Sequence, residues 1–408
     1  MVLNRLRIAA FCAFLGSATC LGVVANAQTL ALVGGNIYAS PEVAPLPDAV
    51  VLVSAGVITA IGSRSEVEIP AEARVMDCTG KTVVAGFWNS HVHFTQAAWK
   101  NAASAPAARL EEHMREMLTR WGFTTVWDLG SDPTDSLPLR RRVNAGEVPG
   151  PDIRTVGSIF PKGGHPAYLP PEMQLPEAAT PDEATKFART YVGLGLDGVK
   201  LFTGSFKGEN NPVVNMDVAI AKAAVDIAHV AGKPVFAHPQ NMTGVETVIA
   251  AGVDVMAHTV AGGPVYSPEQ LARFKQQGIA LIPTLSLFSK LPVGSEIAAR
   301  LVTSTVNQLK AFSDNGGPVL FGTDVGFTTY YDTTLEYELM HRALSERQIL
   351  ASLTTNPAQY FKAAKKGRVE KGFDADVVVL DGDPVTDVSN LAKVAYTIRA
   401  GKVIYQKR

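Results

Sequence analysis

Residues 233–258 read KPVFAHPQNMTGVETVIAAGVDVMAH, and within this stretch a short apolar run twice ends in Ala-His. Both runs have the length of a β-strand, and His238 and His258 occupy the same place at their ends. A single histidine at a strand end is usually a capping residue, but two in consecutive β–α units are hard to explain by structure alone. Since an α/β barrel gathers its chemistry at the carboxyl ends of its strands, the repeat predicts a functional site at a barrel mouth.

Four further polar side chains stand at equivalent places along the chain. His91 and His93 end VVAGFWNSHVHF, Lys200 lies in DGVKLF, and Asp324 ends VLFGTD. Of the eight histidines in the chain, four close such runs, and a fifth, His165, follows another run in PKGGHPAY. Chance would scatter these residues, so their repeated position is the most informative functional signal in the sequence.

Strand-like and helix-like segments alternate through the central part of the chain. Eight apolar runs of strand length lie at 83–94, 123–130, 152–160, 197–202, 233–239, 253–258, 278–285 and 318–324. Their nearly continuous apolar character favours parallel strands that are buried on both faces. Eight such units in about 280 residues predict an α/β fold of the (β/α)8 TIM-barrel type. The alternative, a doubly wound open sheet, would bind its ligand at one switch point and would not distribute polar ends over five strands.

Segments rich in β-structure flank this central region on both sides. Residues 28–85 and 366–408 contain short β-branched runs broken by glycine, asparagine and proline. Neither segment is long enough to form a domain alone. We therefore expect the two to pair into one small β-sandwich domain beside a barrel formed by residues 86–365.

The first 27 residues have the organisation of a signal peptide. Arg5 and Arg7 precede an apolar run at 8–25, and Ala25-Asn26-Ala27 gives the small-x-small pattern of a cleavage site. We expect residues 1–27 to be removed and the protein to be exported, to the periplasm or as a secreted protein. An uncleaved anchor is the alternative, because the run is nearly long enough to span a bilayer.

The composition excludes several classes of partner. Lys and Arg number 37 against 38 Asp and Glu, so no nucleic-acid groove or polybasic membrane patch is indicated. Cys12 and Cys20 lie in the signal segment, which leaves Cys78 alone and allows no internal disulfide. We expect a small-molecule substrate, no nucleic acid and no membrane contact after signal cleavage, with a homo-oligomer left open.

The residue types at the strand ends suit a divalent metal ion. His91 and His93 are two residues apart, so on a strand both imidazoles face the same side, and two neutral imidazoles suit Zn²⁺. Asp324 is a natural ligand and proton shuttle across the mouth, although a helix N-cap is the simpler interpretation. Lys200 either pairs with an acid or, once carboxylated by carbon dioxide, bridges two metal ions.

The ordered motifs HVH (91–93), VK (199–200), FAH (236–238), MAH (256–258) and GTD (322–324) resemble those of the metal-dependent amidohydrolase superfamily. The segment GFDADVVVLDGDP (372–384) resembles the family's return to its β-sandwich domain. The similarity spans residues 29–408 and favours the subgroup of imidazolonepropionase-like and exported prolidase-like enzymes. It implies a barrel flanked by a small β-sandwich that both ends of the chain build.

The resemblance also implies a metal centre made of His91, His93, Lys200, His238, His258 and Asp324. In binuclear members of the family a carboxylated lysine bridges two ions, and Lys200 occupies the matching place. Mononuclear members lack this lysine or use it otherwise, so one or two ions, with Zn²⁺ as the expected metal, stay open.

The expected chemistry is hydrolysis by metal-activated water. Zn²⁺ lowers the pKa of its water from about 15.7 to roughly 7. Asp324 is expected to take and return the proton, and the metal or His258 to polarise the substrate carbonyl. His165 either donates to the same oxygen or is an ordinary loop residue.

We expect cleavage of an amide or peptide-like C–N bond, as in a dipeptidase or a cyclic-amide hydrolase. An ester, lactone or phosphotriester hydrolase is the first alternative, because attack by metal hydroxide does not distinguish these bonds well. A catalytically silent ligand-binding barrel is the second. Aromatic residues that follow the strands can form an apolar substrate pocket: Phe160, Tyr168, Phe202, Phe206, Phe288, Phe327, Tyr330 and Tyr331.

Overall fold

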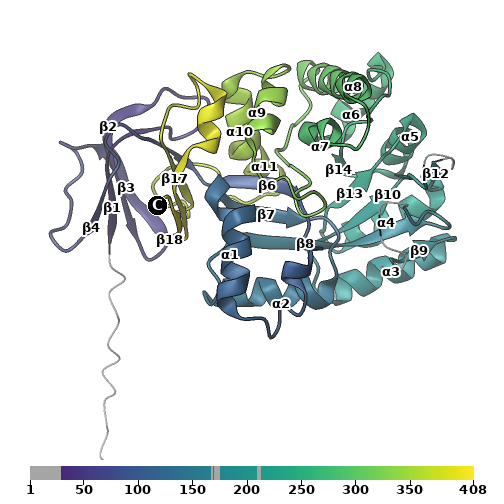
Figure 1. Ribbon diagram of the computed structural model, residues 1–408, viewed down its shortest axis with the longest axis horizontal. Helices are drawn as coiled ribbons and strands as arrows, with labels where there is room; N and C mark the ends of the chain where they lie inside the picture. The colour runs from purple at the N-terminus through teal and green to yellow at the C-terminus, as the bar shows by residue number, and fades with distance from the viewer. Residues whose placement is uncertain (1–28, 167–168, 170–174, 209–212) are drawn as a thin grey trace, which may run out of the picture.

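The computed structural model of the chain describes residues 29–166, 169, 175–208 and 213–408. A small sheet that contains both ends of the described chain stands beside a larger body of strands and helices (Figure 1). The predicted signal peptide and Tyr168 lie outside the described residues. Among the residues described, no helix combines the length and the apolar character needed to cross a membrane.

Seven parallel strands form the sheet of the larger body, in the order β15-β14-β13-β10-β8-β7-β6. They are β6 (Phe87–Val92), β7 (Phe123–Asp128), β8 (Asp152–Pro161), β10 (Gly198–Phe202), β13 (Val235–His238), β14 (Val255–Ala257) and β15 (Ala280–Ile282). Three short strands extend this body: β9 (Glu177–Ala178) pairs with β8, and β11 (Gly204–Ser205) pairs with β12 (Val214–Asn215).

The eighth predicted strand, residues 318–324, closes the sheet between β15 and β6. Val319 bridges Leu281 on one side, and Val325 bridges Val92 on the other. Backbone hydrogen bonds join the same segments, among them the one from Asp324 N to the carbonyl oxygen of His91 at 2.9 Å. The pairing is too irregular to form a continuous ladder. It nevertheless completes the ring, so the prediction of a (β/α)8 barrel is confirmed.

Helices surround the barrel and follow most of its strands. They are α1 (Ala107–Met117), α2 (Pro133–Asn144), α3 (Pro181–Gly193), α4 (Val218–Val230), α5 (Met242–Ala251), α6 (Pro268–Gln277), α7 (Leu285–Ser289), α8 (Ser295–Asp314), α9 (Thr334–His341), α10 (Glu346–Leu353) and α11 (Thr355–Tyr360). Helix α6 shows how local sequence sets such bounds. Ser267 and Gln270 form a capping box at its start, and Gly278 ends it in the left-handed conformation at φ 68°.

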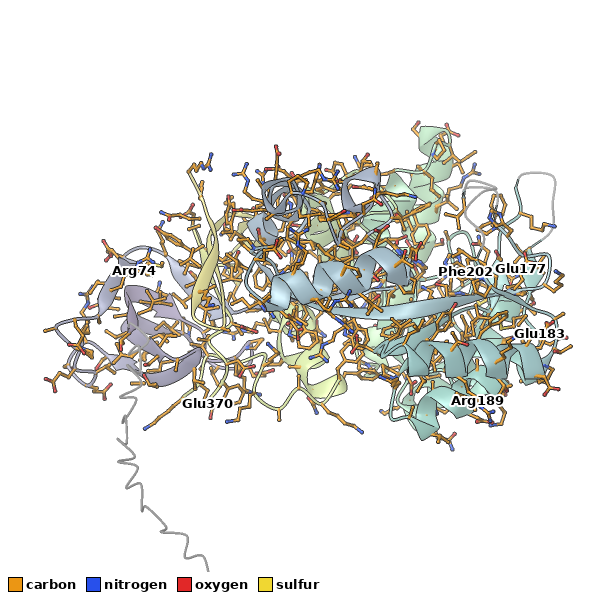
Figure 2. The ribbon with its side chains drawn as sticks, turned by 90° about the horizontal axis from the view of Figure 1, so that it is seen from below. Arg74, Glu177, Glu183, Arg189, Phe202 and Glu370 are labelled. Carbon is orange, nitrogen blue, oxygen red and sulfur yellow. The ribbon has the colours of Figure 1, made fainter. Side chains whose placement is uncertain are left out.

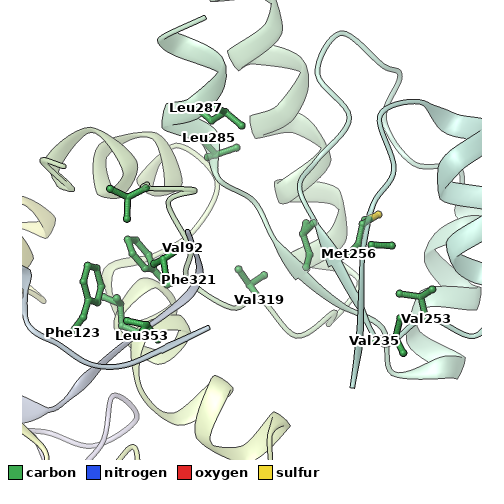
Figure 3. Close-up of a cluster of buried hydrophobic side chains, with 14 of the residues drawn as sticks. Val92, Phe123, Val235, Val253, Met256, Leu285, Leu287, Val319, Phe321 and Leu353 are labelled. Atoms are coloured by element: carbon green, nitrogen blue, oxygen red, sulfur yellow. The ribbon is translucent and has the colours of Figure 1, made fainter. Parts of the chain in front are cut away.

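The barrel strands are buried on both faces. Inside the ring, Trp88, Trp127, Phe236 and Leu320 belong to one apolar cluster. A second cluster lies between strands and helices, where the Phe123 and Phe321 rings stack 5.9 Å apart (Figure 3). Burial on both sides explains why the strands read as continuous apolar runs rather than as alternating ones.

The small sheet has the strand order β18-β17-β16-β5-β1-β2-β3, with β4 paired to β1. Its strands are β1 (Leu30–Ile37), β2 (Leu46–Ser54), β3 (Val57–Ser63), β4 (Arg74–Asp77), β5 (Thr82–Ala85), β16 (Val377–Leu380), β17 (Val394–Arg399) and β18 (Lys402–Gln406). The antiparallel pairing of β5 with β16 joins the two ends of the chain, as predicted.

Hydrogen bonds also bring the far edge of this sheet back toward its middle. Ile58 N donates to Phe373 O at 2.9 Å, and Gly372 N donates to Ile58 O at 2.8 Å, so the sheet curls over its own apolar core. Cys78 is buried in that core, and burial raises the pKa of its thiol to about 11. The thiol therefore packs as a small apolar group. The domain limits at 85/86 and 365/366 stay predictions.

Candidate metal centre

The closed barrel brings His91, His93 and Asp324 together, although Asp324 is more than 200 residues away in sequence. One ligand atom from each of the three lies within 4.8 Å of the others. The Nε2 atoms of the two histidines are 3.2 Å apart, and Asp324 Oδ1 lies 3.1 Å from His91 Nε2 and 2.9 Å from His93 Nε2. Three donor atoms therefore point at one small volume at the carboxyl ends of the strands.

The other predicted histidines border this cluster. The His258 ring lies 4.6 Å from the ring of His91 and 4.6 Å from the ring of His238. His258 Nε2 is 4.0 Å from Asp324 Oδ2. Four imidazoles from β6, β13 and β14 and the residues directly after them thus form a continuous array around one carboxylate.

Lys200 lies on β10, one strand away from His238. It pairs in register with Phe236, two residues before the end of the neighbouring strand β13, and only 1% of its surface is exposed. The ion pairs of Asp324 are with histidines. Within the part of the chain that the structure describes, no carboxylate oxygen lies within 4.0 Å of Lys200 Nζ, so the first of the two alternatives for Lys200, a direct ion pair with an acid, is not formed, and Asp324 acts on the amine only over a longer distance.

Burial and mutual contact place the cluster in the protonation state that binds metal. Burial lowers the pKa of His91 to about 3 and that of His238 to about 4, and it holds the pKa of His258 well below its usual value. Burial alone would raise the pKa of Asp324, but the imidazoles of His91 and His93 hold it well below the usual range. At neutral pH Asp324 is therefore ionised, while His91, His238 and His258 are neutral.

These donors fit a divalent cation. Asp324 Oδ1 is buried and lies close to two imidazole nitrogens, yet it makes no hydrogen bond of good geometry to them. His91 Nδ1 is also buried and has no hydrogen-bond partner among the described residues. A carboxylate oxygen with two imidazole nitrogens converging on it, and no proton donor for it, is the arrangement that a Zn²⁺-like ion satisfies.

The backbone at the cluster is strained. Asp324 has φ 59° and His258 has φ 144°, and Gln240 and Thr284 beside them have φ 47° and 48°. These are four of the nine non-glycine residues with positive φ in the described part of the chain. Strained residues that concentrate at one place mark a site where tertiary contacts dictate side-chain direction.

Two glycines allow the segments that carry the ligands to approach. A Cβ on Gly326 would lie 1.8 Å from His93 O, and one on Gly322 would lie 2.9 Å from His91 Cβ. Any larger residue would push the segment around Asp324 away from the two histidines. The GTD motif thus needs its glycine for close packing.

Sequence reasoning missed Asn89, which ties the two ligand-bearing segments together. Its Nδ2 donates to Thr323 Oγ1 at 2.8 Å, and its Oδ1 accepts from His91 N at 3.2 Å and Thr323 N at 3.3 Å. Asn89 is fully buried. A polar residue inside the apolar run GFWNSHVHF was the only signal in the sequence that could have indicated it.

Asp128 supports the mouth from β7, as a structural residue would. Its Oδ1 accepts from Ser131 Oγ at 2.5 Å and its Oδ2 from Thr155 Oγ1 at 2.8 Å. Ser131 Oγ in turn accepts from Phe94 N at 2.6 Å, directly after His93. The carboxylate therefore anchors the chain at the place where it leaves the metal cluster.

His165 lies in the loop that follows β8, and the cluster of three ligands does not include it. Its backbone N–H donates to Glu177 Oε1 at 3.0 Å, and Ser205 donates a short hydrogen bond to Gly164 O. Figure 2 shows Glu177 and Phe202 near each other at the end of the molecule that lies away from Arg74 in the small sheet. The loop is thus anchored to neighbouring segments at that end.

An aromatic wall lines the same end. The rings of Phe160 and Phe202 stack at 3.8 Å, and Phe202 stacks on His238 at 5.2 Å. Phe288 lies 6.3 Å from His258. Aromatic rings therefore contact two of the four histidines.

A cavity of about 670 Å³ lies at the opposite end of the barrel. Asp197, Lys233 and Asp254, which line it, precede β10, β13 and β14. None of the residues of the metal cluster lines it. It is therefore separate from the site at the carboxyl ends of the strands.

Comparison with known proteins agrees with this geometry. The model of the amidohydrolase family matches residues 82–404. The chain belongs to the amidohydrolase family. The family resemblance read from the sequence is thereby confirmed.

Solved structures and curated proteins are similar to this chain over much of its length. A structure described as a candidate prolidase from Bifidobacterium longum is 27% identical, with a TM-score of 0.79 over 94% of this chain and 97% of that one. Ochratoxinase from Aspergillus niger is 22% identical over 84% of this chain and 79% of its own length. An uncharacterised protein from Mycobacterium tuberculosis is 27% identical, and the match spans 65% of that protein, less than two thirds of its length.

Proposed function

We propose that this amidohydrolase uses metal-activated water to cleave the amide bond of a dipeptide or of an N-acylated amino acid. The observation that carries the proposal is the set of His91, His93 and Asp324, whose ligand atoms lie within 4.8 Å of one another at the barrel mouth, with His91 and Asp324 buried and His93 half-buried. The likeness to the candidate prolidase from Bifidobacterium longum supports a substrate with a peptide bond.

The proposed metal is Zn²⁺, with His91, His93 and Asp324 as ligands of a first ion. His238, His258 and a carboxylated Lys200 would hold a second ion, with Lys200 as the bridge. Burial lowers the pKa of Lys200 to about 7, so much of the amine is uncharged at neutral pH, which is the form that reacts with carbon dioxide. The lack of an acidic partner among the described residues supports the same assignment.

When bound, a divalent ion supplies an acidified water and a Lewis acid at this place. Asp324, ionised at neutral pH, takes the proton of the attacking water and delivers it to the leaving nitrogen. His258, whose Nε2 lies 4.0 Å from Asp324 Oδ2, would help to hold the ion that polarises the carbonyl oxygen of the substrate. His165, from the loop after β8, is proposed as a hydrogen-bond donor to that carbonyl oxygen.

The aromatic wall supports a substrate with an apolar group beside the scissile bond. Phe160, Phe202 and Phe288 present ring surface next to His238 and His258. Stacking on these rings would align the amide with the metal cluster while it excludes water.

Export is proposed from the signal-peptide pattern of residues 1–27. Expression of the full chain in a Gram-negative host, followed by N-terminal sequencing of periplasmic protein, should give a mature chain that begins at Gln28. Recovery from the cytoplasm or the membrane with Met1 intact would contradict this part.

The decisive experiment is a substrate panel with metal-assayed protein. Purified enzyme would be tested on Xaa-Pro and other apolar dipeptides, N-acyl amino acids, esters, lactones and phosphotriesters, with bound metal measured in parallel. We expect metal-dependent turnover of amides. Turnover confined to esters, lactones or phosphotriesters would contradict amide cleavage, and bound metal without turnover on any class would favour a silent barrel.

Asp324→Asn tests the proton shuttle and has a matched control in Asp226→Asn. Removal of a general acid–base group should lower kcat by about 10² to 10⁴-fold. Asp226 is an exposed residue of α4 that pairs with Lys222 at 2.7 Å, so its amide should keep the wild-type rate. Equal rates for the two variants would refute the role of Asp324.

A further inference from the structure

The ring of His258 has a hydrogen-bond partner that lies outside the metal cluster. Its Nδ1 is 2.7 Å from Thr284 Oγ1, and both residues are buried. Thr284 follows β15, the strand next to β14, so this contact joins two adjacent strand ends. His258 Nε2 faces Asp324 on the other side of the ring.

The hydroxyl of Thr284 fixes which nitrogen of His258 carries the proton. A hydroxyl has one hydrogen, and Thr284 Oγ1 donates it to Pro283 O at 2.8 Å. Towards His258, Thr284 Oγ1 is therefore the acceptor, and Nδ1 of the neutral ring is the donor. The lone pair is left on Nε2, the atom that faces the cluster.

Thr284 holds this position in an unfavourable backbone conformation. Its φ is 48°, in the left-handed region that β-branched residues rarely adopt. An ordinary turn would not impose this conformation on threonine. Some contact outside the turn must stabilise it.

Glu336 supplies that contact from helix α9. Its Oε1 accepts from Leu285 N at 2.8 Å and its Oε2 from Ser286 N at 2.6 Å. These are the two residues directly after Thr284. Glu336 is fully buried, and both of its oxygens are used on this short segment. A buried acid is costly, so one that serves two backbone amides at this point holds the start of α7 in place.

We propose that Thr284 and Glu336 are positioning residues for His258: Glu336 holds the strained turn, and the turn presents Thr284 Oγ1 to His258 Nδ1. The Nε2 lone pair of His258 is thereby fixed toward Asp324. This series of contacts, from Glu336 through Thr284 to His258, is inferred from the hydrogen bonds alone. Its consequence for metal binding and turnover rests on the proposed function.

Ring ¹⁵N spectra of histidine-labelled full-length protein test this series of hydrogen bonds directly. Spectra of the metal-loaded protein and of the same protein after chelation report which nitrogen of each ring is protonated. His229 is an internal reference, because its own ring contact, Nε2 to Asp254 Oδ2 at 2.9 Å, lies outside the metal cluster. We expect His258 to carry its proton on Nδ1 in the wild type.

Two substitutions of matched shape separate the hydroxyl from packing. Thr284→Val keeps the branched shape but has no acceptor, so His258 should lose its single tautomer while His229 is unchanged. Thr284→Ser keeps the acceptor and should restore the wild-type spectrum. If Thr284→Val fails to fold, Thr284→Ala removes the same acceptor with a smaller side chain. A wild-type His258 spectrum in the variants that lack the hydroxyl would overturn the proposal.

Glu336→Gln tests the second step, because the amide retains one accepting oxygen and loses the other. The His258 signals should move in the same direction as in Thr284→Val. For both variants, affinity for Zn²⁺ measured by chelator competition should fall about 10 to 100-fold, and kcat should fall with little change in KM. An unchanged His258 spectrum in Glu336→Gln would show that Glu336 does not position His258. A shifted His258 spectrum in protein that hydrolyses no amide would support the positioning roles and refute only the proposed function.

Discussion

Gly322 has no side chain, and both the closure of the barrel and the position of the metal ligands depend on this lack of a side chain. A Cβ there would lie 2.4 Å from Ile282 Cγ2 and 2.9 Å from His91 Cβ, both closer than real Cβ contacts. Ile282 is fully buried inside the ring, so it has no free volume into which to retreat. Gly322→Ala must therefore push the closing segment away from β6 and β15.

The cost can be worked from this geometry. Overpacking of a filled core costs about 1–3 kcal/mol, which is the expected loss in the free energy of unfolding. The metal cluster should suffer relatively more, because His91 and Asp324 lie on the two segments that separate. Metal–ligand distances tolerate a change of about 0.2 Å, so we expect metal affinity to fall about tenfold or more, equivalent to about 1.4 kcal/mol.

The assay is metal content after dialysis against graded chelator, with the thermal midpoint measured on the same samples. Gly193→Ala is the control, because Gly193 ends α3 and a Cβ there would meet nothing within 4 Å. Its substitution should raise stability by about 0.4–1 kcal/mol and leave metal affinity unchanged. Wild-type metal affinity and midpoint in Gly322→Ala would show that the closing segment does not constrain the ligands.

Three further results are expected. Lys200→Ala should lower the metal content from two ions per chain to one, and added short carboxylic acids should partly restore activity; unchanged stoichiometry would remove the bridge. Chelation should lower the thermal midpoint and Zn²⁺ should restore it, since an ion present at 100 times its Kd stabilises the folded state by about 2.7 kcal/mol. Burial raises the pKa of Glu336 from 4.5 to about 7, so the folded state binds more protons than the unfolded state between these values. The free energy of unfolding should therefore fall by roughly 3 kcal/mol as pH rises from 4.5 through 7, and a denaturant series on Glu336→Gln should show a flatter profile.

Several features of this enzyme followed from the sequence because they depend on local pattern. A parallel strand buried on both faces reads as a continuous apolar run, and its last residue must lie at the barrel mouth whatever the rest of the chain does. The positions of His91, His93, His238, His258 and Asp324 could be predicted for this reason. The pairing of the two terminal segments followed likewise, since neither could bury an apolar face alone.

Other features became visible only in the tertiary structure. The sequence allowed either an acid partner or a carboxylated bridge for Lys200, and only the packed barrel shows that no carboxylate oxygen of the described residues lies within 4.0 Å of its amine. The roles of Asn89 and Glu336 depend on distant partners, because Thr323 lies 234 residues from Asn89, and Leu285 and Ser286 lie 51 and 50 residues from Glu336. The sequence by itself therefore determined which side chains reach the mouth, through the period of the strand. The closure of the barrel determined how the ligand atoms of these side chains are oriented, because their orientation depends on contacts between segments that meet only when the barrel is complete.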